Sequence, residues 1–189
     1  ARHTIEHCSL VLPADMQRMA ALDIHASMQP AHAFSDPTIE ATLGLERLCR
    51  QHPCHSLQDA GVNLAFGTDY SIVPMNPILT LLVASTRLNY HFETNWGPEE
   101  AVSIEDAIRQ YTIGSARTQK LEDDLGSIEV GKYGDFVLFD FDLRCIDNPL
   151  FLLTNDMESG KLDRKVIMTV VDGKIVYYRD GESYKAQAI

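Results

Sequence analysis

Gly61-Val62-Asn63-Leu64-Ala65-Phe66-Gly67-Thr68-Asp69 is the stretch with the strongest structural signal in this chain. Its apolar residues form a nearly continuous run that a glycine interrupts, which is typical of a buried strand. An aspartate follows at the carboxyl end of that strand. In (β/α) barrels the catalytic groups lie at the carboxyl ends of the strands. The stretch therefore predicts an α/β fold in which Asp69 lies at the functional edge of a parallel sheet.

Strand and helix alternate through the first part of the chain, residues 1–121. Short strands are predicted at Thr4–His7 and Asp23–Met28, ahead of the strand that ends at Asp69. Alternation at this spacing is typical of parallel β/α units. The predicted helices are Asp15–Leu22, Thr38–Arg50, Pro77–Leu88 and a helix that begins after the N-cap residue Ser103.

The second part of the chain, residues 122–189, reads as a small antiparallel β unit. Glycine turns surround a predicted short strand within Leu125–Lys132, and Asp135–Asp140 is a strand rich in Phe, Val and Leu. Lys165–Val171 and Lys174–Tyr178 are joined by an Asp-Gly turn, which is a strong signal for a β-hairpin.

The composition limits the kinds of partner that the chain is expected to bind. The chain has 189 residues, 45% of them hydrophobic, and a net charge of -11. An acidic surface repels nucleic acids and acidic membranes, so we expect neither as a partner. There is no run of eighteen apolar residues, hence no predicted transmembrane helix. The four cysteines form no C-x-x-C pair, and we expect reduced thiols in a cytoplasmic protein.

Two strand ends carry groups that suit metal-assisted hydrolysis. The imidazole of His7 is a good zinc ligand, and the carboxylate of Asp69 can bind a metal or take a proton from water. His32 follows another strand end and can polarise a substrate carbonyl. Each group also has an ordinary interpretation, because a lone strand-end histidine is more often structural and an Asp after Gly-Thr often caps a turn. Other histidines have weaker cases, and His52 and His55 read as loop residues beside a proline.

Several motifs, in order, closely resemble those of the amidohydrolase superfamily. They are Arg2–His7, Ala26–His32 and Ala60–Asp69, followed by Ser103–Thr112 and Leu125–Asp135. The chain is most similar to amidohydrolase family 3, the group that contains N-substituted formamide deformylases and proteins labelled exoenzyme regulatory protein. The resemblance extends over nearly the whole chain.

The resemblance implies roles for four residues. His7 matches the metal-ligand histidine of barrel strand six, and Asp69 matches the strand-eight aspartate that binds metal and activates water. Gln29 and His32 match the Gln-Pro-x-His motif of strand seven, which borders the substrate pocket. The implied cofactor is a divalent metal, zinc in the first instance. The implied reaction is hydrolysis of a C–N bond in an amide, formamide or N-acyl compound through a metal-activated water.

The family's amino-terminal motifs, including His-x-His, are absent from this sequence. We therefore expect a C-terminal fragment: residues 1–121 would be strands six to eight of a (β/α)8 TIM barrel, and 122–189 part of a composite β-sandwich. A partial barrel leaves strand edges unpaired, so we expect self-association or pairing with the missing N-terminal part. We also expect the isolated fragment to be inactive. The alternative function is a non-catalytic regulatory or interaction module that keeps the fold.

Overall fold

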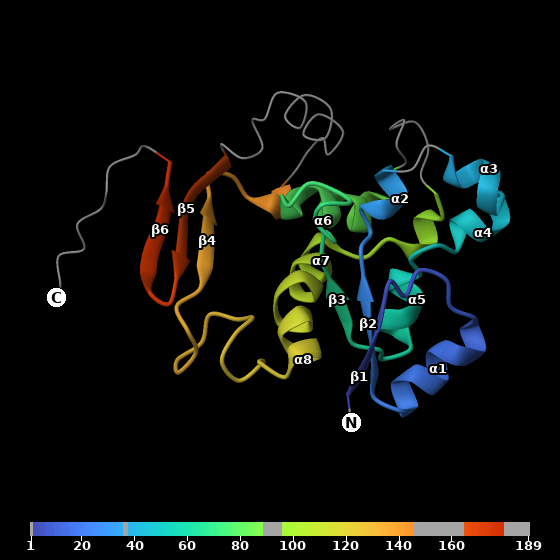
Figure 1. Ribbon diagram of the computed structural model, residues 1–189, viewed down its shortest axis with the longest axis horizontal. Helices are drawn as coiled ribbons and strands as arrows, with labels where there is room; N and C mark the ends of the chain where they lie inside the picture. The colour runs from blue at the N-terminus through green and yellow to red at the C-terminus, as the bar shows by residue number, and fades with distance from the viewer. Residues whose placement is uncertain (1, 36–37, 89–95, 146–164, 180–189) are drawn as a thin grey trace. The chain divides into compact units, whose positions relative to one another are not determined.

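The computed structural model describes residues 2–35, 38–88, 96–145 and 165–179 (Figure 1). The chain divides into two compact units, residues 1–122 and 123–189. The strands are β1 (His3–Glu6), β2 (Ile24–Met28), β3 (Leu64–Phe66), β4 (Phe136–Phe139), β5 (Val166–Val171) and β6 (Lys174–Tyr178). The α-helices are α1 (Pro13–Ala21), α2 (His32–Ser35), α3 (Ile39–Leu43), α4 (Leu45–Cys49), α5 (Cys54–Asp59), α6 (Pro77–Thr86), α7 (Ile104–Arg109) and α8 (Ser115–Gln119). Short turns of other helix types are η1 (Pro98–Glu100), the π-helix η2 (Gln110–Gly114) and η3 (Leu143–Cys145).

The first unit is built on a parallel sheet in the order β1-β2-β3. The register pairs Glu6 with Ser27 and Met28 with Phe66, so the three strands end at one edge. The helices between the strands pack on them, α1 against β2 and α5 against β3 (Figure 1). The sheet is therefore a pair of parallel β/α units, as the alternation of strand and helix predicts.

The core of this unit surrounds β2, β3 and α6. Ala26, Met28 and Leu64 are completely buried, and all three residues of β3 are buried. Helix α6 is buried at seven consecutive positions, from Ile78 to Ala84. Such a helix lies inside the unit rather than on its surface. No described helix has both the length and the apolar character needed to cross a bilayer.

The π-helix η2 lies directly against the backbone of β3. A Cβ atom added at Gly114 would lie 2.2 Å from the carbonyl oxygen of Leu64, so only glycine permits this approach. The next residue, Ser115, donates from its hydroxyl to the carbonyl oxygen of Phe66 over 3.1 Å. Segment 114–115 therefore fixes the position of the strand that leads to Asp69.

Two local predictions are wrong. The helix predicted over Thr38–Arg50 is divided into α3 and α4, because Gly44 adopts a left-handed φ of 73° that no helix interior accommodates. The strand predicted within Leu125–Lys132 is also absent, and this described segment consists of turns. The N-cap prediction is confirmed, since the hydroxyl of Ser103 accepts from the backbone N–H of Asp106 over 3.0 Å.

The second unit contains an antiparallel sheet in the order β4-β5-β6. The hairpin of β5 and β6 turns at Asp172 and Gly173, whose φ angles are 52° and 70°. Positive φ at both positions is typical of the tight turn that Asp-Gly favours. Asp135, just before β4, accepts from the backbone N–H of Asp172 over 2.7 Å and holds this turn.

Candidate metal site

The three strand ends of the first unit bring two imidazoles and a carboxylate together. His7 follows β1, His32 begins α2 after β2, and Asp69 follows β3. One possible ligand atom from each of the three lies within 4.8 Å of the others. The residues are 25 and 37 positions apart in sequence, so the parallel topology alone makes them neighbours.

Asp69 is the centre of this cluster. Its Oδ2 atom lies 3.9 Å from Nδ1 of His7 and 3.9 Å from Nε2 of His32. The two imidazole rings are nearly parallel, with centroids 6.2 Å apart. The carboxylate therefore lies close to both imidazole rings.

Gln29 fixes the ring of His7. Its Oε1 atom lies 2.9 Å from Nδ1 of His7, and Gln29 is itself buried. An amide oxygen can only accept, so Nδ1 carries the proton and the lone pair of Nε2 is left for a metal. Metal-binding histidines are usually oriented in this way by a hydrogen bond to the other ring nitrogen. The structure thus places Gln29 beside His7 in addition to its predicted position near substrate.

The backbone is strained at both ends of the cluster. His7 and Asp69 each have a φ of 53°, in the left-handed region that residues with a Cβ atom rarely adopt. A histidine in this conformation costs about 1–2 kcal/mol, and aspartate costs less because its side chain bonds locally. Strained residues of this kind concentrate at functional sites.

His32 is held in its neutral form. Burial lowers the pKa of its imidazole, and the positive charge that His7 can carry lowers it further. A hydrogen bond with the backbone of Thr68 and the charge of Asp69 oppose this shift without cancelling it. A neutral imidazole can ligate a metal or hydrogen-bond a substrate, whereas a protonated one cannot ligate.

The donor set fits a divalent cation such as zinc. Imidazole nitrogen and carboxylate oxygen are typical zinc ligands, and catalytic zinc usually has three protein ligands. Ligand atoms around a tetrahedral zinc lie about 3.3 Å apart. The 3.9 Å separation between Oδ2 of Asp69 and Nε2 of His32 reaches this value after a side-chain shift of well under 1 Å. The sequence assigned His32 to substrate, and the structure adds the possibility that it serves as a third ligand.

A cavity of about 730 Å³ opens beside the cluster on the side of β1 and α1. His7 and Cys8 line it together with apolar side chains that include Leu10, Leu12 and Met19. Asp15 and Arg18 also line it, so the cavity combines apolar walls with a few polar groups, as small-molecule sites usually do.

His52 lies in a loop, as predicted, whereas His55 lies in α5 and not in a loop. The loop position of His52 is nevertheless a buried one. Its side chain is completely buried, and neither ring nitrogen has a hydrogen-bond partner within the described part of the chain. Burial, reinforced by the nearby charge of Arg87, lowers its pKa to about 3. Its backbone N–H donates to the carbonyl oxygen of Ser9 over 2.7 Å, which places it beneath the segment that follows His7.

Arg87 organises the segment around His52. The pair Thr86-Arg87 is one of the stretches that resemble the family, but the sequence gives the arginine no role. It is 3% exposed, and its guanidinium donates to the carbonyl oxygens of Gln51, His52, Trp96 and Gly97 over distances of 2.6 to 3.3 Å. These hydrogen bonds hold the segments 51–52 and 96–97 at the carboxyl end of α6.

A parallel sheet with two histidines and an aspartate at its carboxyl edge defines an α/β protein with a candidate metal centre. Comparison with known sequences then identifies the family. A sequence model described as the amidohydrolase family matches residues 1–177, and the chain belongs to that family.

Individual relatives agree with this assignment. The chain is 32% identical over 180 residues to Protein LONG AFTER FAR-RED 3 of Arabidopsis thaliana, covering 93% of this chain and 29% of that protein. It is 29% identical to the N-substituted formamide deformylase of Arthrobacter pascens, covering 94% of this chain and 31% of the relative. The chain thus spans about three tenths of the length of these curated relatives.

Solved structures give the same fold. An uncharacterized metal-dependent hydrolase from Pyrococcus horikoshii OT3 superposes with a TM-score of 0.67 at 32% identity, over 76% of this chain and 29% of that one. An adenosine deaminase from Xanthomonas campestris, solved with bound zinc, superposes with a TM-score of 0.62 at 21% identity over 93% of this chain and 37% of that one. The second likeness concerns the fold alone.

Proposed function

We propose that this chain is the C-terminal portion of a metal-dependent amidohydrolase that hydrolyses a C–N bond in a small amide, formamide or N-acyl compound. The observation that carries the proposal is the convergence of His7, His32 and Asp69 at one edge of a parallel sheet. The similarity to an N-substituted formamide deformylase supports the class of bond. On this proposal β1, β2 and β3 are strands six to eight of a barrel, and the second unit is part of a composite β-sandwich.

The proposed roles follow from the geometry. His7 and Asp69 would hold the ion, because Gln29 leaves Nε2 of His7 unprotonated and the carboxylate of Asp69 lies 3.9 Å from the same imidazole ring, at Nδ1. A bound divalent ion would lower the pKa of water at the site and so supply the nucleophile at neutral pH.

Asp69 and His32 would act on the substrate. The carboxylate of Asp69 is placed to accept the proton of the attacking water and to deliver it to the departing nitrogen. His32, neutral and 3.9 Å from that carboxylate, would donate a hydrogen bond to the substrate carbonyl oxygen as negative charge develops there. Gln29 would keep the ring of His7 in one orientation throughout the reaction.

Metal binding tests the site and hydrolysis tests the reaction. We expect one zinc ion per chain by calorimetric titration, and loss of that binding in His7→Gln and Asp69→Asn. Asparagine tolerates the left-handed backbone of residue 69, so this variant changes the chemistry rather than the fold. The matched control is His55→Gln, since His55 and Asp59 form an exposed pair elsewhere in the unit.

Hydrolysis is measured with N-formyl and N-acyl amines on the protein that carries this chain. We expect Asp69→Asn to slow turnover by about 10²–10⁴-fold, the usual contribution of a general base. We expect His32→Gln to retain the metal and lose turnover. Wild-type rates in Asp69→Asn would refute the assignment of the base, and loss of zinc in His32→Gln would make His32 a ligand instead.

A further inference from the structure

A second cavity lies at the other end of β3, away from the candidate metal site. Its volume is about 390 Å³, and its lining includes Asn63, which precedes the strand, and Gln58 of α5. Arg109, Gln110 and Arg117 line it from the α7, η2 and α8 segment. Asp69 follows the carboxyl end of β3 and Asn63 precedes its amino end, so the two sites are separated by the length of the strand.

The cavity holds two arginines without a carboxylate partner. Within the described residues, neither Arg109 nor Arg117 forms an ion pair, although the chain carries a net charge of -11. Arg117 contributes least to lowering the pKa of Glu122, after a backbone hydrogen bond and the hydrogen bond and charge of Arg2, and that carboxylate is paired with Arg2. The guanidinium groups of the cavity therefore keep donors for a ligand.

The one carboxylate in the lining is already engaged. Oδ2 of Asp106 accepts from the hydroxyl of Ser103 over 2.8 Å and from the amide of Gln58 over 3.2 Å. Gln110 in turn donates to the amide oxygen of Gln58 over 2.8 Å. These hydrogen bonds engage Oδ2 of Asp106 and the amide oxygen of Gln58. None of them uses the guanidinium N–H groups of Arg109 and Arg117, which remain available to a ligand.

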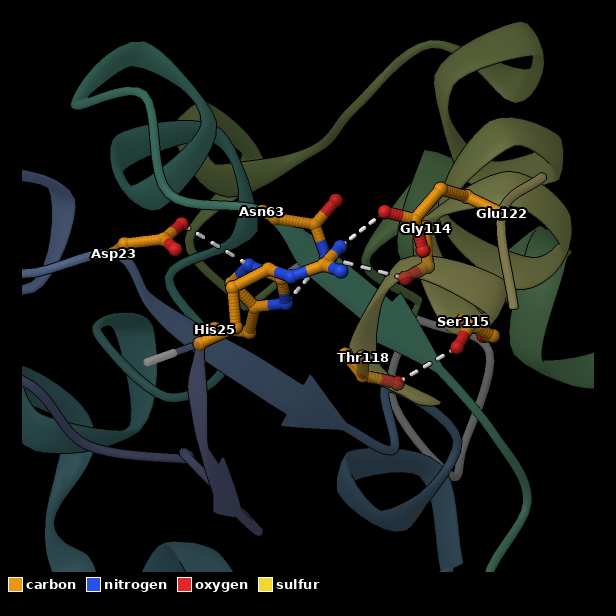
Figure 2. Close-up of polar contacts among 8 residues, drawn as sticks. Asp23, His25, Asn63, Gly114, Ser115, Thr118 and Glu122 are labelled. Atoms are coloured by element: carbon orange, nitrogen blue, oxygen red, sulfur yellow. Dashed lines mark hydrogen bonds and ion pairs between the residues drawn. The ribbon is translucent and has the colours of Figure 1, made fainter. Parts of the chain in front are cut away.

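The wall of the cavity is rigid and has an unusual backbone. The side-chain amide of Asn63 donates to the carbonyl oxygen of Gly114 over 3.1 Å and lies 3.4 Å from Nδ1 of the buried His25 (Figure 2). Nε2 of His25 lies 3.4 Å from Oδ1 of Asp23. Gln110 and Gly114 belong to a π-helix, a structure that is frequently found at functional sites.

We propose that this cavity binds a compact oxyanion with two negative charges, either a phosphate or a dicarboxylate. Arginine forks bind both oxyanions bidentately, and the two arginines outnumber the one carboxylate of the lining, that of Asp106. The site is independent of the metal centre. Its wall includes Gly114, which contacts β3, so a ligand here would bind to the segment that supports Asp69.

The test is calorimetric titration of the chain with inorganic phosphate and, separately, with malonate. We expect saturable millimolar binding of at least one, weakened about tenfold or more by Arg109→Gln and by Arg117→Gln. Arg117→Lys keeps the charge and should lose less. The control is Arg47→Gln, an exposed arginine of α4 outside the cavity, which should bind as wild type does.

Each outcome of these titrations supports or overturns the proposal. Preference for phosphate or for malonate identifies the class of ligand. Unchanged binding in Asp69→Asn shows that the anion does not occupy the metal site, whatever that site proves to hold. Absence of saturable binding by either anion, or equal losses in Arg47→Gln and the two cavity variants, overturns the proposal. Circular dichroism on each variant verifies that a loss of binding is not a loss of fold.

Discussion

Replacing Gly114 with alanine provides the sharpest test of how the sheet is held. Gly114 has an ordinary helical φ of -61°, so its backbone conformation does not require glycine. An alanine in a helix is normally more stable than glycine by about 1 kcal/mol. Here the new Cβ would lie 2.2 Å from the carbonyl oxygen of Leu64 and 3.3 Å from that of Arg109. Both contacts are to backbone atoms, which cannot rotate away.

The cost can be worked from that contact. Since Cβ atoms essentially never lie closer than 3.0 Å to such a neighbour, η2 and β3 must separate by about 0.8 Å. Overpacking of this kind costs about 1–3 kcal/mol, and loosening the bond from Ser115 to Phe66 adds about 1 kcal/mol. After the gain in helix propensity is subtracted, we expect a net loss of about 2 kcal/mol. For a chain of this size the melting temperature would fall by about 4–8 °C.

Thermal unfolding followed by circular dichroism measures this change. The matched control is Gly67→Ala, because an added Cβ at Gly67 meets no atom within 4 Å and its φ is not left-handed. We expect that control to be neutral or slightly stabilising, by at most about 1 kcal/mol. If Gly114→Ala melts at or above the wild-type temperature, the close approach of η2 to β3 is not real.

Four further predictions follow from buried or exposed groups. The pKa of His52 is lowered to about 3 in the folded chain, so the unfolded chain binds an extra proton below about pH 6.5. The free energy of unfolding should therefore fall by roughly 1.4 kcal/mol for each unit by which the pH is lowered from about 6 to about 4. His52→Phe should reduce this pH dependence, while His55→Gln should leave it unchanged. Arg87→Met removes the guanidinium donors of four carbonyl oxygens, of which those of His52 and Gly97 keep a backbone donor while those of Gln51 and Trp96 lose theirs. It should cost about 3 kcal/mol in urea unfolding, against under about 0.5 kcal/mol for the exposed Arg50→Met. Burial raises the pKa of Cys54 to about 12, so its thiol should resist alkylation until the chain unfolds. Leu10, Leu12 and Leu22 are 52%, 67% and 61% exposed, so light scattering should detect self-association at micromolar concentration, and a stable monomer would contradict this.

The parallel sheet could be predicted because its signals are local. Apolar runs ending in Gly67 and Pro30 mark two strand ends, and parallel topology places such ends at one edge whatever the distance in sequence. The cap at Ser103 and the Asp-Gly hairpin turn likewise depend on a few adjacent residues. The same logic suggested His7 and Asp69 as neighbours, and in the structure their side chains lie 3.9 Å apart.

Long-range contacts explain what the sequence did not reveal. His52 precedes a proline and reads as a loop residue, but the backbone carbonyl of residue 52 accepts from Arg87, 35 positions away, and the side chain is buried. A glycine inside a helical pattern can be tolerated or can end the helix, and nothing near Gly44 distinguishes the two outcomes. The orientation of His7 by Gln29 depends on the register between β1 and β2, which the spacing alone does not give.

The candidate metal site depends on the backbone contacts that hold β3 more than on the packing of the site's own side chains. Strand β3 has only three residues, and it is held by β2 on one side and by Gly114 and Ser115 through the π-helix. Oδ2 of Asp69 and Nε2 of His32 need a shift of well under 1 Å to share a zinc ion, which is comparable to the 0.8 Å separation that Gly114→Ala would impose. That variant should therefore weaken zinc binding at temperatures where the chain is still folded. The position of β3 depends on the glycine that lets η2 approach the carbonyl oxygen of Leu64, five residues before Asp69.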